Sequence, residues 1–150
     1  MASTTLPSHF SEFLQLLNQE KVEYLLVGGW AVGLHGRARY TADIDFWYRL
    51  DPENASRVLR VLNQFGIDDP ALTQEVLLSR GRIFRMGWPP MRIELLNTID
   101  GVEFDTCYER RYMLTVDDVE IAVISRDDLI ANKRASNRPK DLADVDELGG

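Results

Sequence analysis

Apolar residues recur along this 150-residue chain with two different spacings, which together predict a protein built from helices and strands. Spacings of three and four residues indicate one face of a helix, and the clearest case is the apolar stripe between Phe10 and Leu17. Continuous or alternating apolar runs indicate strands. Helices are expected at 8–21, 30–36, 51–65, 70–78, 125–136 and from Pro139 onward, and strands at 24–27, 43–48, 82–86, 91–96, 112–115 and 119–124.

Residues with strong terminal preferences mark the ends of several of these elements. Ser8 is expected to cap the first helix. Asp51 followed by Pro52 is typical of a helix start, because proline suits the first turn. Ser125, with Asp128 three residues later, forms a capping box that opens a late helix. These signals agree with the apolar spacing and support the same set of elements.

The order of the elements predicts the fold class. Strands interleave with helices along the chain, and the strand pairs 82–86 with 91–96 and 112–115 with 119–124 are expected to be hairpins. This mixture predicts an α/β or α+β fold with a mixed β-sheet flanked by helices. The sequence has no repeat, low-complexity tract or linker, so residues 1–150 are expected to form a single domain.

Composition fits a globular protein of the cytoplasm. Apolar residues make up 45% and charged residues 27% of the chain. The first residues lack the basic and apolar regions of a signal peptide, and the longest nearly apolar run, Leu25 to Leu34, is far shorter than the roughly 20 residues that span a bilayer. The single cysteine, Cys107, cannot form an internal disulfide. We therefore expect no membrane association and a cytoplasmic location.

The charge distribution favours a small anionic ligand. The net charge of −7 argues against strong non-specific nucleic-acid binding. Basic residues nevertheless gather in two segments, 80–92 and 126–140. An acidic protein with two local basic clusters is compatible with a ligand such as a nucleoside triphosphate.

Asp43 and Asp45 are the strongest candidates for chemistry. Side chains alternate along a strand, so these two carboxylates project from one face while Ile44 and Phe46 point into the core. Two neighbouring carboxylates repel each other and raise each other's pKa. A cation between them relieves the repulsion, and hard oxygen ligands of this kind suit Mg²⁺.

Two further features would complete a site for metal and phosphate. Gly28-Gly29 forms a turn before a helix, whose backbone N–H groups could bind phosphate. A third acid is wanted where two metal ions act on a triphosphate. Three acids stand at strand-like positions, each between two apolar residues. Glu94 lies on the most convincing strand, Glu103 with Asp105 is the alternative, and Glu120 is expected to face solvent on a hairpin.

These motifs together resemble the polymerase-β-like nucleotidyltransferase superfamily, in particular its small bacterial members, the minimal nucleotidyltransferases and those of abortive-infection and toxin–antitoxin systems. The resemblance spans residues 24 to 148. Its motifs are Leu26-Val27-Gly28-Gly29-Trp30-Ala31, His35 to Asp45, Ile93-Glu94-Leu95-Leu96, Ser125 to Lys133, Arg138-Pro139-Lys140-Asp141, and Asp144.

The resemblance implies a role for each motif. Asp43, Asp45 and Glu94 would ligate Mg²⁺, with Mn²⁺ as an alternative. Gly28 and Gly29 would approach the triphosphate, where a side chain would collide with it. Arg39 and Lys133 would contact phosphate or base. Acids at 141 and 144 would hold Lys133 or Arg138 in place. The sequence has glycine at position 29 where many members have serine, and glutamate at 94 where aspartate is common.

Two functional hypotheses follow from the resemblance. The first is a metal-dependent enzyme that transfers NMP, with AMP favoured, from an NTP to an acceptor hydroxyl and releases pyrophosphate. The second is a binding module with the nucleotidyltransferase fold that serves in a toxin–antitoxin or defence pair. The sequence leaves the acceptor open, and a protein partner could supply the acceptor or part of its binding surface.

Overall fold

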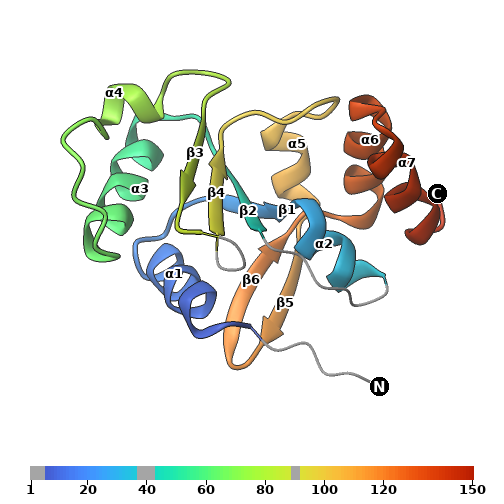
Figure 1. Cartoon of the computed structure of the whole chain (residues 1–150), viewed down its shortest axis with the longest axis horizontal. Coiled ribbons are helices and arrows are strands. Elements are labelled where there is room, and N and C mark those ends of the chain that lie inside the picture. Colours follow the sequence, from blue (N-terminus) through green and yellow to red (C-terminus); the bar gives the residue numbers. More distant parts are fainter. Residues whose placement is uncertain (1–5, 37–42, 89–91) are drawn as a thin grey trace.

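The computed structural model describes residues 6–36, 43–88 and 92–150, and within these ranges the chain forms one six-stranded mixed sheet with seven helices. The strand order across the sheet is β3-β4-β2-β1-β6-β5 (Figure 1). The strands are β1 (Tyr24–Val27), β2 (Asp43–Tyr48), β3 (Ile83–Met86), β4 (Arg92–Leu96), β5 (Tyr112–Val116) and β6 (Val119–Val123).

Strand directions in the sheet are mixed, as the sequence predicts. β3 and β4 pair antiparallel, as do β5 and β6, which confirms both expected hairpins. β2 runs antiparallel to β1 but parallel to β4, while β1 runs parallel to β6. The parallel pairing of β2 with β4 positions the candidate site, because it aligns the strand that carries the aspartate pair with the strand that carries Glu94.

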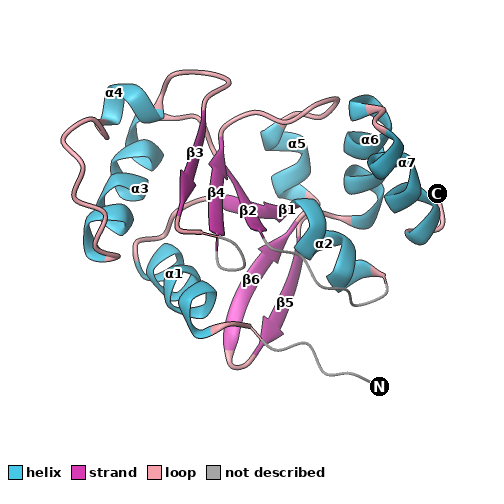
Figure 2. Ribbon diagram, viewed as in Figure 1, coloured by secondary structure: helices cyan, strands magenta, loops and turns pink. Residues whose placement is uncertain are grey.

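The helices form two groups beside the sheet (Figure 2). Helix α3 contacts both α1 and α4 in one group, α6 contacts both α2 and α7 in the other, and α5 lies between the two groups in this view. The helices are α1 (Ser8–Gln19), α2 (Gly28–His35), α3 (Pro52–Gln64), α4 (Gln74–Leu77), α5 (Phe104–Glu109), α6 (Arg126–Ser136) and α7 (Pro139–Glu147). No helix in the described ranges is long and apolar enough to cross a membrane.

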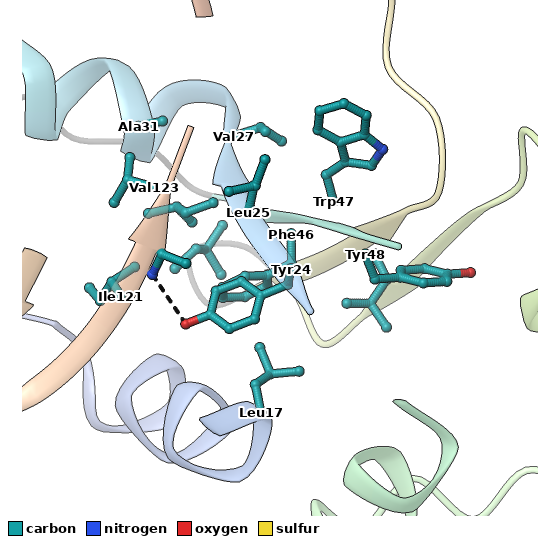
Figure 3. Close-up of a cluster of buried hydrophobic side chains, with 14 of the residues drawn as sticks. Leu17, Tyr24, Leu25, Val27, Ala31, Phe46, Trp47, Tyr48, Ile121 and Val123 are labelled. Atoms are coloured by element: carbon teal, nitrogen blue, oxygen red, sulfur yellow. Dashed lines mark hydrogen bonds between the residues drawn. The ribbon is translucent and has the colours of Figure 1, made fainter. Parts of the chain in front are cut away.

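The central strands carry the hydrophobic core. All four residues of β1 are buried, and Phe46 on β2 packs edge-on against Tyr24 with ring centroids 5.7 Å apart. The Tyr24 hydroxyl accepts a hydrogen bond of 3.4 Å from the backbone N–H of Ala122 (Figure 3). This bond satisfies a polar group that the packing removes from water.

Most helix ends agree with the sequence signals, and two differ. Asp51 and Ser125 cap α3 and α6 with their side chains, as expected. Ser8 does not cap α1; it is the first helical residue, and the position before it is Pro7, whose side chain cannot accept a hydrogen bond. Helix α2 begins at Gly28 rather than Trp30, so the glycine pair forms its first turn.

The segment from Val102 to Glu109 differs from the sequence expectation. The apolar–acidic alternation around Glu103 suggests a strand, but this interpretation is wrong, because Glu103 is the residue before α5. Phe104 and Tyr108 of α5 lie one helical turn apart with stacked rings, and the buried Cys107 anchors the helix. The helix expected at 70–78 is confirmed only as the short α4.

Candidate active site

The register of β2 against β4 brings three carboxylates to one face of the sheet. Asp45 pairs with Glu94 across the two strands, and Asp43 pairs with Arg92. Ile44 on β2 is fully buried, while the aspartates on either side of it are only partly buried. The alternation expected from the sequence is therefore present on β2, and β4 places Glu94 beside it.

Gly28 lies against this acidic face at the junction of β1 and α2. Its φ angle is +72°, a conformation that residues with side chains rarely adopt. A Cβ atom placed on Gly28 would overlap the Oδ2 atom of Asp45. Glycine at this position thus makes room for a carboxylate of the same chain, a constraint that the sequence motif alone does not reveal.

Two arginines neutralise part of the acidic cluster. Arg92 donates two hydrogen bonds to Asp43, one of 2.9 Å from Nε to Oδ1 and one of 3.0 Å from Nη2 to Oδ2. Arg85 on β3 donates from Nε to Oε1 of Glu94 at 2.6 Å. Bidentate arginine–carboxylate pairs are strong when partly shielded from water. Positive charge is therefore already present where the sequence predicts that a cation binds.

Asp45 is the least compensated member of the cluster. Its Oδ1 atom is buried and makes no hydrogen bond with any described residue. Burial raises the pKa of Asp45 to about 8, with further contributions from a hydrogen bond and the charge of Glu94 and from the charge of Asp43. The charge of Lys133 acts in the opposite direction. A buried oxygen without a partner, among further carboxylates, suits a ligand that carries positive charge.

Helices α6 and α7 supply the basic side of the site. The ammonium nitrogen of the buried Lys133 lies 3.3 Å from Oδ1 of Asp141 and 3.3 Å from Oδ2 of Asp144. Arg138 also donates from Nε to Oδ2 of Asp141 at 2.7 Å. Burial alone would raise the pKa of Asp141, but its bonds to Arg138 and Lys133 lower it overall. The two acids therefore hold Lys133 and Arg138, as expected.

One cavity of about 700 Å³ joins these groups. Most of the residues singled out from the sequence line it, namely Gly28, Gly29, Asp43, Asp45, Glu94 and Lys133. Arg39, the remaining one, lies outside the described residues. Arg85 and Arg92 line the same cavity.

The cluster's donor atoms fit a hard cation, but they are not arranged around one. Within the ranges that the structure describes, no three His, Cys, Asp or Glu side chains converge as metal ligands. Asp43 and Glu94 each pair with an arginine. A cation at these acids would share their oxygen atoms with the two arginines, because an ionised carboxylate offers about four acceptor sites.

Glu103, the alternative third acid, does not face the aspartate pair. It is exposed at the start of α5 and lines a separate pocket of about 330 Å³. Asp105, its companion in the sequence, binds Arg49. Glu120 is exposed on the β5–β6 hairpin, as expected. Among the three candidates for the third acid, Glu94 is therefore the one that the fold places next to Asp45.

Comparison with known proteins identifies the family. Residues 5–149 match the family described as nucleotidyltransferase of unknown function (DUF6036). The match covers nearly the whole chain, and the protein therefore belongs to this nucleotidyltransferase family. A search among curated protein sequences found no match.

Solved structures share the fold at low sequence identity. One is the lincosamide antibiotic adenylyltransferase LnuA in its lincomycin-bound form, with 17% identity, a TM-score of 0.58 and 99% coverage of both chains. Another is an antigenic nucleotidyltransferase-like protein from Paracoccidioides brasiliensis, with 16% identity, a TM-score of 0.53, and coverage of 92% of this chain and 72% of that one. At these identities the likeness establishes a nucleotidyltransferase-like fold.

Proposed function

We propose that this protein is a divalent-metal-dependent nucleotidyltransferase that moves NMP, with AMP favoured, from an NTP to an acceptor hydroxyl. The observation that carries the proposal is the grouping of Asp43, Asp45 and Glu94 on one sheet face, in the same cavity as Gly28 and Lys133. Carboxylates for a cation and basic groups for phosphate are the parts that this reaction needs. Membership of a nucleotidyltransferase family supports the same reaction class.

The acidic cluster would hold the divalent cation. Asp43, Asp45 and Glu94 offer the oxygen ligands that Mg²⁺ prefers, with Mn²⁺ as an alternative. The buried Oδ1 atom of Asp45, which has no partner among the described residues, supports this assignment, because a bound cation would satisfy it. When bound, such a cation neutralises charge that develops on the phosphate oxygens.

The two arginines have a second role in this scheme. Arg85 and Arg92 pair with Glu94 and Asp43. Both arginines line the cavity, and their planar guanidinium groups are suited to bind a triphosphate. They would therefore contribute positive charge to the phosphate side of the site, next to the carboxylates that would hold a cation.

The chemistry balances with an ordinary acceptor. The acceptor oxygen bonds to the α-phosphorus, the bond from that phosphorus to the bridging oxygen of the β-phosphate breaks, and pyrophosphate leaves. A carboxylate of the cluster takes the hydroxyl proton. Lys133, held by Asp141 and Asp144, would contact phosphate or base from the α6 side of the cavity.

AMP is the favoured group for a specific reason. LnuA, which shares the fold across 99% of both chains, is an adenylyltransferase by its description. Because that likeness rests on 17% identity, the nucleotide preference must be measured on this protein. Calorimetric competition among the four ribonucleoside triphosphates for one binding site would measure this nucleotide preference.

Transfer of label from α-³²P-ATP in the presence of Mg²⁺ and cell extract tests the proposal. Wild-type protein should label an acceptor, and the double variant Asp43→Asn/Asp45→Asn should lose this activity by a factor of about 10³ or more. Glu120→Gln is the matched control, since it removes an exposed acid of the same sheet far along the chain from the cluster. Equal labelling by the double variant and the wild type would refute the proposal.

The second candidate function is a partner-binding module of a toxin–antitoxin or defence pair. One observation favours it, namely that arginines already neutralise Asp43 and Glu94, as they would in a fold whose acids are structural. Calorimetric titration with Mg²⁺ separates the two functions. The enzyme is supported if the wild type shows heat of Mg²⁺ binding and the double aspartate variant does not. The module is supported if the wild type binds no Mg²⁺ and forms a stable protein complex in mass photometry.

A further inference from the structure

A second pocket adjoins the cavity of the candidate active site. Its volume is about 330 Å³, and Thr98 and Ile99 line both it and the larger cavity. Ligand pockets for small molecules begin at about this size. A molecule seated in the second pocket would therefore border directly on whatever occupies the first.

The two pockets follow one face of β2. Asp43, Asp45 and Trp47 project from the same face because side chains alternate, and Trp47 lines the second pocket. Successive residues of a strand advance by about 3.4 Å, so Trp47 lies roughly 7 Å beyond Asp45. This spacing matches the length of a small molecule that reaches from the second pocket to the carboxylates.

Trp47 carries an unexplained polar group. Its side chain is 2% exposed, yet its indole N–H makes no hydrogen bond with any described residue. Figure 3 shows the indole nitrogen directed away from Leu25 and Phe46 of the core cluster. Buried tryptophan N–H groups usually find an acceptor. A ligand oxygen in the pocket would supply one.

The rim of the pocket also holds charges that the fold does not use. Arg49 is engaged, because it pairs with Glu23 and Asp105 and lies over the ring of Phe104. Arg80 and Glu103 are exposed and form no ion pair or side-chain hydrogen bond among the residues that the structure describes. Both exposed side chains are therefore available to a ligand at the rim.

We infer that the second pocket is the acceptor subsite, and that the acceptor is a small molecule with several hydroxyl groups. One hydroxyl attacks the nucleotide beside Asp45, while another oxygen accepts from the Trp47 indole N–H. The inference rests on the proposed nucleotidyl transfer. The pocket's small volume favours a small molecule over a protein or RNA acceptor.

A pocket-filling variant tests the subsite. Val102 is a partly buried residue of the pocket lining, and Val102→Trp places a larger side chain there to fill the pocket. Met113→Trp is the matched control, because it adds the same indole at an exposed site on β5. Each protein is given α-³²P-ATP, Mg²⁺ and the low-molecular-mass filtrate of a cell extract, and ATP binding is measured separately by calorimetry.

The expected result is a loss of transfer without a loss of nucleotide binding. Val102→Trp should label the filtrate about tenfold less than wild type at unchanged ATP affinity, and Met113→Trp should match wild type. Trp47→Phe, which keeps an aromatic ring but removes the N–H, should raise the filtrate concentration needed for half-maximal labelling by about tenfold. Thermal unfolding checks that each variant is folded.

Other results overturn the inference. Full transfer by Val102→Trp would show that the acceptor binds elsewhere while the proposed reaction stands. Wild-type protein that binds ATP and labels protein or RNA in the whole extract, but nothing in the filtrate, would exclude a small-molecule acceptor. Absence of both ATP binding and transfer in wild type is the failure of the proposed function itself.

Discussion

Gly28 shows at the scale of a single residue how tightly the site is built. Its φ of +72° and its contact with Asp45 act together, because an added Cβ would be strained and would overlap the carboxylate. Gly66 has a φ of +98° but nothing within 4 Å of an added Cβ. Comparing Gly28 with Gly66 therefore distinguishes the cost of backbone strain from the cost of a steric overlap.

We predict that Gly28→Ala lowers the free energy of unfolding by more than Gly66→Ala does. Backbone strain alone should cost Gly66→Ala about 1–2 kcal/mol, and displacement of Asp45 should add to this in Gly28→Ala. Urea unfolding monitored by circular dichroism measures both. Equal losses would mean that the contact with Asp45 has no energetic weight.

Asp45 is a second residue whose chemistry opposes stability. Its raised pKa of about 8, against an ordinary value of 3.8, means that the fold disfavours its charged form. The destabilisation is therefore absent below about pH 4 and grows as pH rises toward 8. Functional carboxylates often carry such a penalty.

Asp45→Asn should consequently stabilise the metal-free protein. We expect the gain in the free energy of unfolding to be largest at pH 8, at about 1.4 kcal/mol for each unit by which the fold raises the pKa of Asp45, and to shrink toward zero near pH 4. Saturating Mg²⁺ should reduce the difference in stability between the two proteins, because the cation is expected to stabilise only the wild type. Thermal unfolding in EDTA and in Mg²⁺ gives the comparison, and a variant less stable than wild type at pH 8 would contradict it.

At the scale of elements, Lys133 joins α6 to α7. Its ammonium group lies between Asp141 and Asp144, and all three side chains are at most 9% exposed. Removing one partner from a buried ionic group leaves the other charges without compensation. The geometry of the two helices therefore depends on this lysine.

Lys133→Met should destabilise the protein by about 3–5 kcal/mol. Arg134→Met is the control, since Arg134 is exposed on the same helix. The exposed substitution should change stability by no more than about 0.5 kcal/mol. Chemical unfolding of the two variants measures this contrast, and a Lys133→Met protein as stable as Arg134→Met would show that the buried ion pairs add nothing.

Local patterns predict most elements of this fold, and α5 shows where they fail. β2 and the hairpins are readable because alternation and turn residues act over a few neighbours. Around Glu103 the same alternation is misleading, since Phe104 begins a six-residue helix that has no side-chain cap. Packing of Phe104 against Trp47 of β2 supports that helix, and a contact between residues so far apart in the sequence is not visible in a local pattern.

In the candidate site, too, local patterns predict some features, whereas others depend on how distant strands are aligned. The common face of Asp43 and Asp45 follows from strand alternation alone. The bonds from Arg92 to Asp43 and from Arg85 to Glu94 depend on how β2, β4 and β3 are aligned. Alignment joins residues up to 49 positions apart, so the sequence could identify these side chains as charged but not as partners.

At the scale of the whole molecule, the cavity is shared by elements from both halves of the chain. The β1–α2 junction, β2 and β4 supply one side, and α6 and α7 supply the other. A nucleotide that contacts both sides would tie the sheet to the C-terminal helices. Binding to the folded state alone raises stability by mass action, by about 2.7 kcal/mol at a ligand concentration of 100 Kd.

ATP with Mg²⁺ should therefore raise the unfolding temperature of the wild-type protein. For a chain of this length a gain of that size corresponds to about 5–10 °C. The shift should vanish in EDTA, because triphosphate and carboxylates repel each other unless a cation lies between them. It should also vanish in Asp43→Asn/Asp45→Asn, because this variant lacks two of the carboxylates that would hold the cation. A shift that survives EDTA would assign nucleotide binding to the basic groups alone, and the acidic cluster would then have no part in holding the substrate.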